Sequence, residues 1–302
     1  MLWLIITISA YFILAVVFLI DKYLLVGPIP NPKIYAFYVG VLGIFVLLIV
    51  PFIGFYFPNS FEFFLALISG ASFTYGIYWF FKALKLFESS RIVPAVGGIL
   101  PIFTFLLIFI FSKGKETLTA LGFLSFILLI LGSFLITYEK TKEISLKSLK
   151  MSLVAAFLFA LSFVSAKYIY LSAPFLVGLV WIRIGGCLAA LTFLLSRGLW
   201  EEIFKEKITF QRKTFLIFIS NQAAGAGGNI LQNWAVALAP LIYVAFINAL
   251  QGIQYVFLLI FTVLLSLKFP RLLKEEVSKT VLFQKIAAIL LIGGGLVLLA
   301  IR

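Results

Sequence analysis

The sequence predicts an all-α integral membrane protein with ten transmembrane helices, arranged as two inverted five-helix repeats around a central cavity. The composition is the first reason: 64% of the 302 residues are hydrophobic and 12% are charged. The mean hydropathy is +1.19, which excludes a soluble domain. The second reason is ten apolar runs, each long enough to cross a hydrocarbon core at the rise of an α-helix. The third is a likeness between the two halves.

The first repeat, residues 1–138, contains five apolar runs separated by turn residues. A turn over Val26–Pro32 follows the first run, and Pro58 with Asn59 follows the second. The fourth run has two prolines and two glycines in its first half, which a membrane helix tolerates only where protein or water satisfies the freed backbone groups. The predicted spans are Leu2–Ile20, Ile34–Phe57, Phe61–Phe87, Ile92–Phe111 and Leu118–Tyr138.

A charged stretch, residues 139–150, reads EKTKEISLKSLK and is predicted to link the two halves. The second repeat, residues 151–302, again contains five runs. Its predicted spans are Met151–Tyr170, Pro174–Ser196, Thr214–Leu238, Leu241–Leu267 and Val281–Ile301.

The halves share short sequence patterns in the same order. FLIDKYLL near Ile20 resembles FVSAKYIY near Ser165, and the fifth and tenth spans both contain a glycine-bearing run, LLILGSFLITY and LLIGGGLVLLA. Because five is odd, the second copy must enter the membrane from the opposite side. Inverted repeats of this kind are typical of secondary transporters, whose site lies near the midplane where the repeats meet.

Basic residues in the predicted loops indicate the orientation. The sparse side carries Lys113, Lys115, Lys167 and Arg302. By the positive-inside rule the other side faces the cytoplasm, which places both termini outside a cell membrane. That basic side carries Lys22, Lys33, Lys85, Arg91, Lys140, Lys142, Lys147, Arg197, Lys205, Lys207, Arg212, Lys213, Lys268, Arg271, Lys274 and Lys279.

Several function classes are excluded or disfavoured by the composition. Histidine is absent, which removes histidine metal sites, Ser-His-Asp hydrolysis and histidine proton relays. The net charge of +13 lies in short loops, so we expect no nucleic-acid partner. The single Cys187 cannot form an intrachain disulfide and is expected to be a small core residue. We expect no cofactor, no metal and no enzymatic activity, and a monomer or homodimer whose partners are the bilayer and a small-molecule substrate.

The stretch SSRIVPAVGGILPIFTFLLIFIFSKGKETLTALGFLSFILLILGSFLI resembles the EamA-type repeat of the drug/metabolite transporter superfamily. A looser copy is LIYVAFINALQGIQYVFLLIFTVLL followed by KEEVSKTVLFQKIAAILLIGGGLVLL. The resemblance implies a ten-helix transporter with a cavity walled largely by the third, fourth, eighth and ninth helices. The family's loop glutamate would correspond to Glu116 and to Glu275 or Glu276, although Pro270 interrupts the second loop. Members with cytoplasmic termini differ from the orientation predicted by the loop charges.

Arg183 lies about nine residues inside the seventh predicted span, roughly 13 Å deep at helical rise. A guanidinium there costs about 3 kcal/mol on insertion scales unless it faces the interior of the bundle. The functional interpretation is that Arg183 attracts a carboxylate or phosphate of the substrate. The alternative is that carbonyls or a nearby acid neutralise it structurally.

Amide side chains recur at helical spacing on the eighth and ninth spans. Amides both donate and accept, which suits a polar solute that must also leave. The alternative is interhelical bonding, worth about 0.6 kcal/mol per bond. Aromatic side chains on the third and seventh spans either stack on a substrate or face lipid. The candidate cavity residues are Arg183, Asn229, Gln232, Asn233, Asn248, Gln251, Gln254, Tyr78, Trp79 and Trp181.

The favoured function is a secondary transporter, an exporter or a facilitator, that moves a small polar metabolite, anionic or neutral, by alternating access. Asp21 and Glu88 lie at predicted helix ends, so no mid-membrane carboxylate offers itself as a proton carrier, which favours facilitated diffusion. The alternatives are a lipid-handling membrane protein and a membrane-embedded enzyme.

Overall fold

The computed structural model describes residues 1–26, 29, 31–87, 89–138, 146–204, 212–268 and 279–301. Within these ranges the chain forms helices and no strand. In chain order the elements are α1 (Leu2–Val26), α2 (Pro32–Leu42), the 3₁₀ helix η1 (Gly43–Phe52), α3 (Ser60–Leu86), α4 (Ser89–Phe111), α5 (Ala120–Thr137), α6 (Leu146–Ser172), α7 (Phe175–Thr192), the 3₁₀ turn η2 (Phe193–Leu195), α8 (Arg197–Phe204), α9 (Arg212–Leu238), α10 (Tyr243–Ala249), α11 (Gln251–Lys268) and α12 (Lys279–Ile301).

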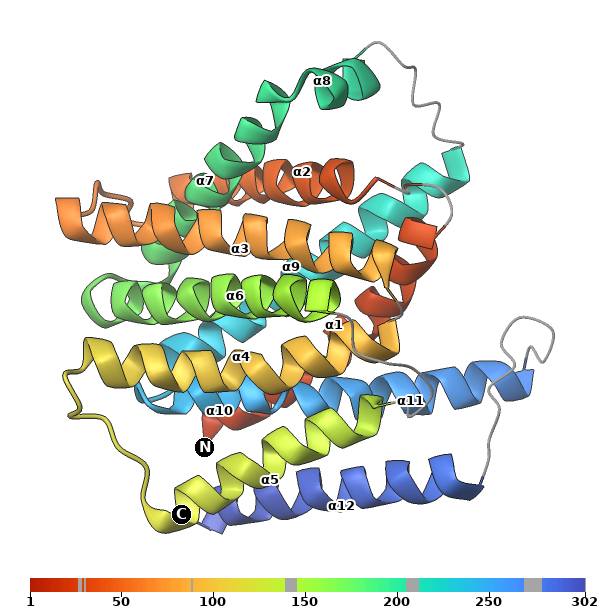
Figure 1. The fold of residues 1–302 in the computed structure, drawn as a ribbon. Helices are drawn as coiled ribbons and strands as arrows, with labels where there is room; N and C mark the ends of the chain where they lie inside the picture. Colours follow the sequence, from red (N-terminus) through yellow and green to blue (C-terminus); the bar gives the residue numbers. More distant parts are fainter. Residues whose placement is uncertain are drawn as a thin grey trace.

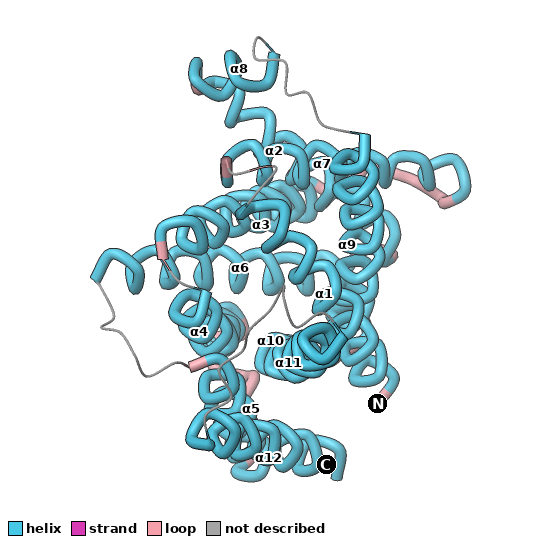
Figure 2. The backbone as a smooth tube through the Cα atoms, turned by 90° about the vertical axis from the view of Figure 1, so that its right-hand side faces the viewer, coloured by secondary structure: helices cyan, strands magenta, loops and turns pink. Residues whose placement is uncertain are grey.

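The long helices run back and forth along one common direction (Figure 1). In that view α3, α6 and α4 lie side by side, with α2 above them and α5 and α12 below. Turned by 90°, the chain shows α1 beside both α9 and α11, and α5 beside α12 (Figure 2). Both termini lie at the end of the molecule that also holds the connections before α3 and before α5. We call this the terminal end, and the other one the opposite end.

Seven helical segments in the described part of the chain are long and apolar enough to cross a membrane. Two more helices, α4 and α5, contain the shorter apolar stretches Ala95–Phe111 and Ala120–Ile136. The predicted eighth span, now α9, is not among the seven because five amide side chains lower its hydropathy. The protein is therefore a multi-pass helical membrane protein. The seven are Leu2–Leu25, Pro32–Phe52, Ser60–Leu86, Leu146–Ser172, Phe175–Leu195, Tyr243–Phe261 and Phe283–Ile301.

Some predicted boundaries were wrong. Helix α1 continues to Val26, so Asp21 lies inside a helix and not at its end. The predicted second span is α-helical only to Leu42, then continues as η1, and residues 53–59 are not helical. The predicted ninth span is interrupted at Leu250, which separates α10 from α11.

Two further differences concern the connections. Helix α6 begins at Leu146, so the last five residues of the predicted linker are helical, while residues 139–145 lie outside the described part. Helix α8, RGLWEEIF, follows α7 and was not predicted. It is too short and too polar to resemble an apolar run, which is why the count of such runs missed it.

Local sequence signals explain where helices begin. Asn59 starts α3 with a capping box: its Oδ1 accepts from the Glu62 backbone N–H at 2.9 Å, and Glu62 Oε2 accepts from the Asn59 N–H at 3.2 Å. Asn31 starts α2 in a similar way, and Pro32 occupies the first helical position, where the missing N–H carries no penalty.

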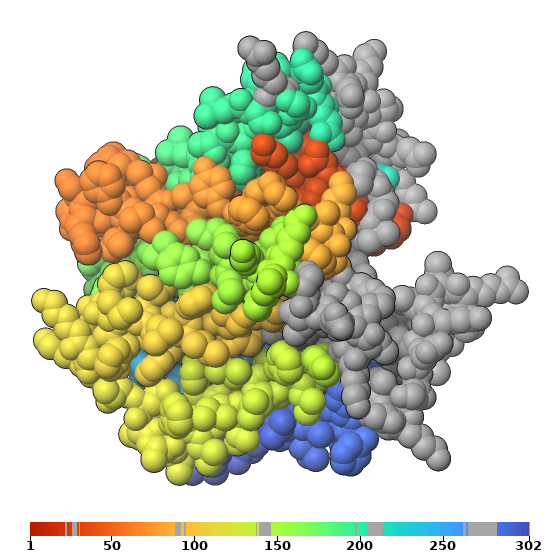
Figure 3. Space-filling view, viewed as in Figure 1, coloured from red at the N-terminus to blue at the C-terminus, as the bar shows by residue number. Residues whose placement is uncertain are grey.

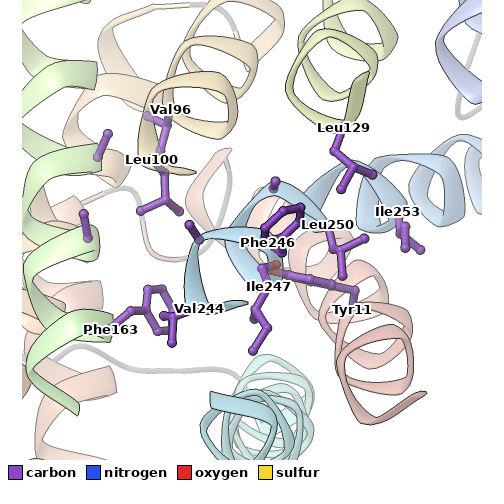
Figure 4. Close-up of a cluster of buried hydrophobic side chains, with 14 of the residues drawn as sticks. Tyr11, Val96, Leu100, Leu129, Phe163, Val244, Phe246, Ile247, Leu250 and Ile253 are labelled. Atoms are coloured by element: carbon purple, nitrogen blue, oxygen red, sulfur yellow. The ribbon is translucent and has the colours of Figure 1, made fainter. Parts of the chain in front are cut away.

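The short helix α10 lies at the centre of the main core (Figure 4). Phe246 and Ile247 are completely buried there. Side chains of α4, α5 and α6 surround them, and the Tyr11 hydroxyl of α1 donates to the Ile247 carbonyl oxygen at 2.7 Å. The outer face that α3, α6, α4 and α5 form together is closely packed (Figure 3). Interruption of the ninth span thus coincides with the most buried part of the chain.

Small residues bring several helices into close contact. A Cβ added to Gly132 of α5 would lie 2.6 Å from Cγ1 of Ile292 of α12, and Ser125 Oγ donates to the Gly295 carbonyl oxygen at 2.7 Å. The glycine-bearing runs common to the fifth and tenth predicted spans therefore pack against each other. Small residues of α9 lie against α1 in the same way: a Cβ on Gly228 would meet the Leu14 side chain at 2.9 Å.

Lys167 was wrongly counted among the loop charges. It lies inside α6, is 2% exposed, and donates from Nζ to the carbonyl oxygens of Ala237 at 3.0 Å and Ala239 at 2.6 Å. Ala237 lies in the last turn of α9 and Ala239 directly follows that helix, where no further helical turn provides N–H donors. The lysine therefore closes the end of α9 and does not report on orientation.

The crossing of α3 and α7 provides a test of this packing. A Cβ on Gly70 would lie 2.1 Å from the Ile182 carbonyl oxygen and 2.3 Å from the Gly186 nitrogen, so Gly70→Ala must push the two backbones apart. We expect a loss of about 1–3 kcal/mol, measured as a fall in Tm of the detergent-solubilised protein. Gly294→Ala on α12 is the control, because nothing lies within 4 Å of the added methyl group and its Tm should not fall. Equal Tm values for the two variants would contradict this crossing.

Candidate functional site

A pocket lies between the helices of the two halves, with about 500 Å³ of atom-free space that includes its opening. Its walls come from α2, η1, α3, α6, α7 and α9. This differs from the cavity implied by the family resemblance, which used the third, fourth, eighth and ninth helices. The lining residues are Ala36, Val39, Gly40, Gly43, Gly70, Phe73, Thr74, Ile77, Ser162, Phe163, Ile182, Arg183, Gly186, Asn229 and Asn233.

Arg183 is the one charged residue among those that line the pocket. It is half-buried; its guanidinium donates from Nη2 to Asn229 Oδ1 and lies 5.9 Å from the centre of the Phe73 ring. In the described part of the chain no carboxylate pairs with it and no second hydrogen-bond acceptor contacts it. A guanidinium has five N–H donors, so most of its donor capacity remains available in the pocket.

The two asparagines of α9 are held by a short chain of hydrogen bonds. Asn233 Nδ2 donates to Asn229 Oδ1 at 2.8 Å and to the Asn229 carbonyl oxygen at 2.9 Å. Tyr170 of α6 donates to Asn233 Oδ1 at 2.9 Å. Because both amide oxygens already accept hydrogen bonds, the pocket offers mainly donors. Such a surface suits a solute rich in oxygen acceptors, such as hydroxyl, carboxylate or phosphate groups.

None of the other four amide candidates lines this pocket, and three of them join helices. Gln232 donates to the Tyr11 hydroxyl at 3.3 Å, and Gln254 donates to the Leu14 carbonyl oxygen at 3.2 Å. Asn248 is fully buried and donates to Thr104 Oγ1 of α4 at 2.8 Å. Gln251 has a buried side-chain oxygen with no partner among the described residues.

The three aromatic candidates also lie outside the pocket. Tyr78 packs against Phe193 at 5.5 Å between ring centres, and Lys82 Nζ lies 4.8 Å from the centre of the Trp79 ring. Trp181 donates to the Tyr56 carbonyl oxygen at 3.2 Å and packs among phenylalanines near the start of α3.

Sequence reasoning missed several parts of the site. Thr74 faces the pocket and donates to the Gly186 carbonyl oxygen at 3.1 Å, and Tyr170 orients Asn233. Neither side chain stands out in an apolar run, because Thr and Tyr are common in membrane helices.

Among the described residues no group of three or more Asp, Glu or Cys side chains is placed to hold a metal ion.

The comparisons with known proteins give relatives at low identity. Two proteins from strains of Staphylococcus epidermidis, both named "Putative ribose uptake protein RbsU", are 27% and 26% identical over 243 residues. Each alignment covers 74% of this chain and 81% of the relative. A crystal structure of a protein with 14% identity has a TM-score of 0.64 and covers 99% of this chain and 96% of its own, which shows a shared fold. No family model matches the chain.

The bond between Arg183 and Asn229 is open to a double-mutant cycle. We expect Arg183→Met and Asn229→Ala to be coupled by about 1.5–3 kcal/mol, the usual worth of a hydrogen bond to a charged group. The measurement is the free energy of unfolding of both single variants, the double variant and the parent in one detergent. Additive effects would show that the guanidinium does not depend on Asn229.

Proposed function

We propose that this protein is a secondary transporter that moves a small polar metabolite across the cell membrane, with the pocket at Arg183 as its substrate site. The observation that carries the proposal is an arginine inside a membrane-spanning helix whose guanidinium faces a pocket and has no described carboxylate partner. A charge inside the membrane is unfavourable unless it has a polar partner or serves a function. A solute with oxygen acceptors would be the hydrogen-bond partner of the guanidinium, and binding that solute would be its function.

The names of the relatives narrow the solute class. A ribose uptake protein handles a pentose, and a pentose presents several hydroxyl oxygens to the free N–H groups of Arg183 and to Asn229 Nδ2. We propose a polyhydroxylated solute, either neutral or carrying a carboxylate or phosphate. A charged solute would gain charge-assisted bonds with the guanidinium, so the two cases differ measurably in their dependence on Arg183.

We further propose that residues 1–138 and 151–302 are inverted repeats of the EamA type, which work by alternating access. The helix contacts support this, because each contact between two helices has a counterpart between the corresponding helices of the opposite halves. Helix α1 packs on α9 as α6 packs on α3, α11 packs on α1 as α4 packs on α6, and α5 packs on its counterpart α12. Helices α1 and α6 run in opposite directions, as an inverted pair must (Figure 1).

The orientation follows from the same proposal. Both termini lie at the terminal end in Figure 1, whereas the end of α3 with Lys85 and the start of α6 with Lys147 lie at the opposite end. We propose that the basic, opposite end faces the cytoplasm and that both termini face outward.

Uptake by proteoliposomes tests the function. We expect counterflow of radiolabelled ribose by the purified protein, and a fall of at least about tenfold in Arg183→Gln, because a hydrogen bond to a charged group is lost. Excess ribose 5-phosphate and unlabelled ribose are the competitors. Stronger competition by the phosphate, lost in Arg183→Gln, would identify an anionic solute; equal competition would identify a neutral one.

The matched control is Lys113→Gln, which removes one positive charge from the connection before α5, far from the pocket, and should leave counterflow unchanged. Undiminished ribose counterflow by Arg183→Gln, with competition by ribose 5-phosphate unchanged, would remove Arg183 from the site. Absence of counterflow in the parent protein would remove ribose as a solute.

A further inference from the structure

A second, partly buried polar cluster lies outside the pocket, where α1, α2 and α9 meet. Asp21 Oδ1 accepts a hydrogen bond from the Tyr35 hydroxyl and another from Asn221 Nδ2 at 2.6 Å. Gln222 Nε2 donates to the Tyr35 oxygen at 3.2 Å. Asp21 thus lies in a polar cluster within the membrane-spanning stretch Leu2–Leu25, although its place in the sequence indicated a helix end.

The hydrogen bonds of this cluster are incomplete. Both donors reach the same carboxylate oxygen, Oδ1, and Oδ2 has no partner in the described part of the chain. Asn221 is 1% exposed, and its Oδ1 is buried without a partner among the described residues. A buried acceptor without a donor is unfavourable. Among the described residues the cluster thus contains two acceptor oxygens without a protein donor, Asp21 Oδ2 and the buried Asn221 Oδ1, and a proton on Asp21 would add one donor to it.

Among the described side chains, no charged group on the surrounding elements neutralises Asp21. On α2 these are Lys33, Tyr35 and Tyr38, and on α3 they are Lys82 and Lys85; none forms an ion pair with Asp21 within the described residues. Lys82 lies over the Trp79 ring. On α8, Glu202 accepts from Asn31 at 2.6 Å. The side chains of Lys22 on α1 and of Arg212 and Lys213 on α9 lie outside the description.

The cluster is linked to the pocket through two of its walls. Tyr35 directly precedes Ala36, which lines the pocket, and Asn221 precedes Asn229 by eight residues, about 12 Å at helical rise. Helices α2 and α9 both run from the opposite end toward the terminal end, so the cluster lies on the opposite-end side of the pocket (Figure 1). The Asp21–Asn221 bond also connects the first half of the chain to the second.

We propose that Asp21 is a proton-binding site, and that the proton it takes up couples a proton gradient to solute movement through the pocket. The coupling part depends on the proposed transport function, whereas the proton-binding part does not. A proton on Oδ2 removes the charge that strengthens the bonds from Tyr35 and Asn221, and it supplies the donor that the cluster lacks. The bonds that hold α1 against α9 therefore differ between the two protonation states.

Carbodiimide labelling tests proton binding without knowledge of the solute. Dicyclohexylcarbodiimide modifies protonated carboxyl groups in apolar surroundings, and mass spectrometry reads each acid in one digest. We expect modification of Asp21 to fall at least about tenfold between pH 6 and pH 9, with Glu62 and Glu116 as internal comparisons. Tyr35→Phe removes a donor to the carboxylate, so half-maximal labelling should move upward by about one pH unit. Labelling of Asp21 that is absent at every pH, or that follows Glu116, would overturn the proposal.

Proton movement in proteoliposomes tests the coupling. A ribose gradient directed into the liposomes should change the pH of the lumen, towards acid for symport and towards alkali for antiport, as measured with trapped pyranine. In Asp21→Asn the number of protons moved per ribose should fall at least about tenfold. Ribose counterflow without any proton movement in the parent protein would overturn the coupling while the transporter proposal stands. No ribose counterflow would reject ribose instead, and carbodiimide labelling would still decide whether Asp21 binds a proton.

Discussion

A positive charge inside an apolar bundle constrains the rest of this molecule. The Arg183 guanidinium lies within a span made almost entirely of hydrocarbon side chains, where an unpaired charge is strongly unfavourable. The protein provides one amide oxygen and one aromatic ring as neighbours. Gly43 lies beside the arginine, where an added Cβ would meet Arg183 Cδ at 3.6 Å, whereas Gly40 and Gly70 allow α7 to pack closely against α2 and α3.

The contacts between the halves are also polar in places where lipid would not tolerate polar groups. Amides of α9 and α11 bond to α1, and Asn248 bonds to α4. These bonds hold helices of one half against helices of the other.

Much of the fold was readable in the sequence because apolar length and turn residues fix where membrane helices begin and end. The site was less readable. Helical spacing places Arg183 and Trp181 about 160° apart around α7, and the structure puts only Arg183 in the pocket. Helical spacing shows which side chains share a face of a helix, but not which neighbouring helix that face contacts. On α9, Asn229 lines the pocket while Gln232 donates to Tyr11. That choice depends on packing between distant segments.

The 3₁₀ winding of η1 has a geometric consequence. Ten residues wound at about 2.0 Å each cover about 20 Å, whereas an α-helix of the same length covers about 15 Å. Together with α2 the segment of 21 residues covers about 36 Å, which is about 5 Å more than an α-helix of that length and more than a hydrocarbon core of about 30 Å. Rewinding it as an α-helix would draw the tip before α3 inward by about 5 Å and turn its outer side chains around the axis. The length of the pocket wall that begins at Gly43 therefore depends on how this segment is wound.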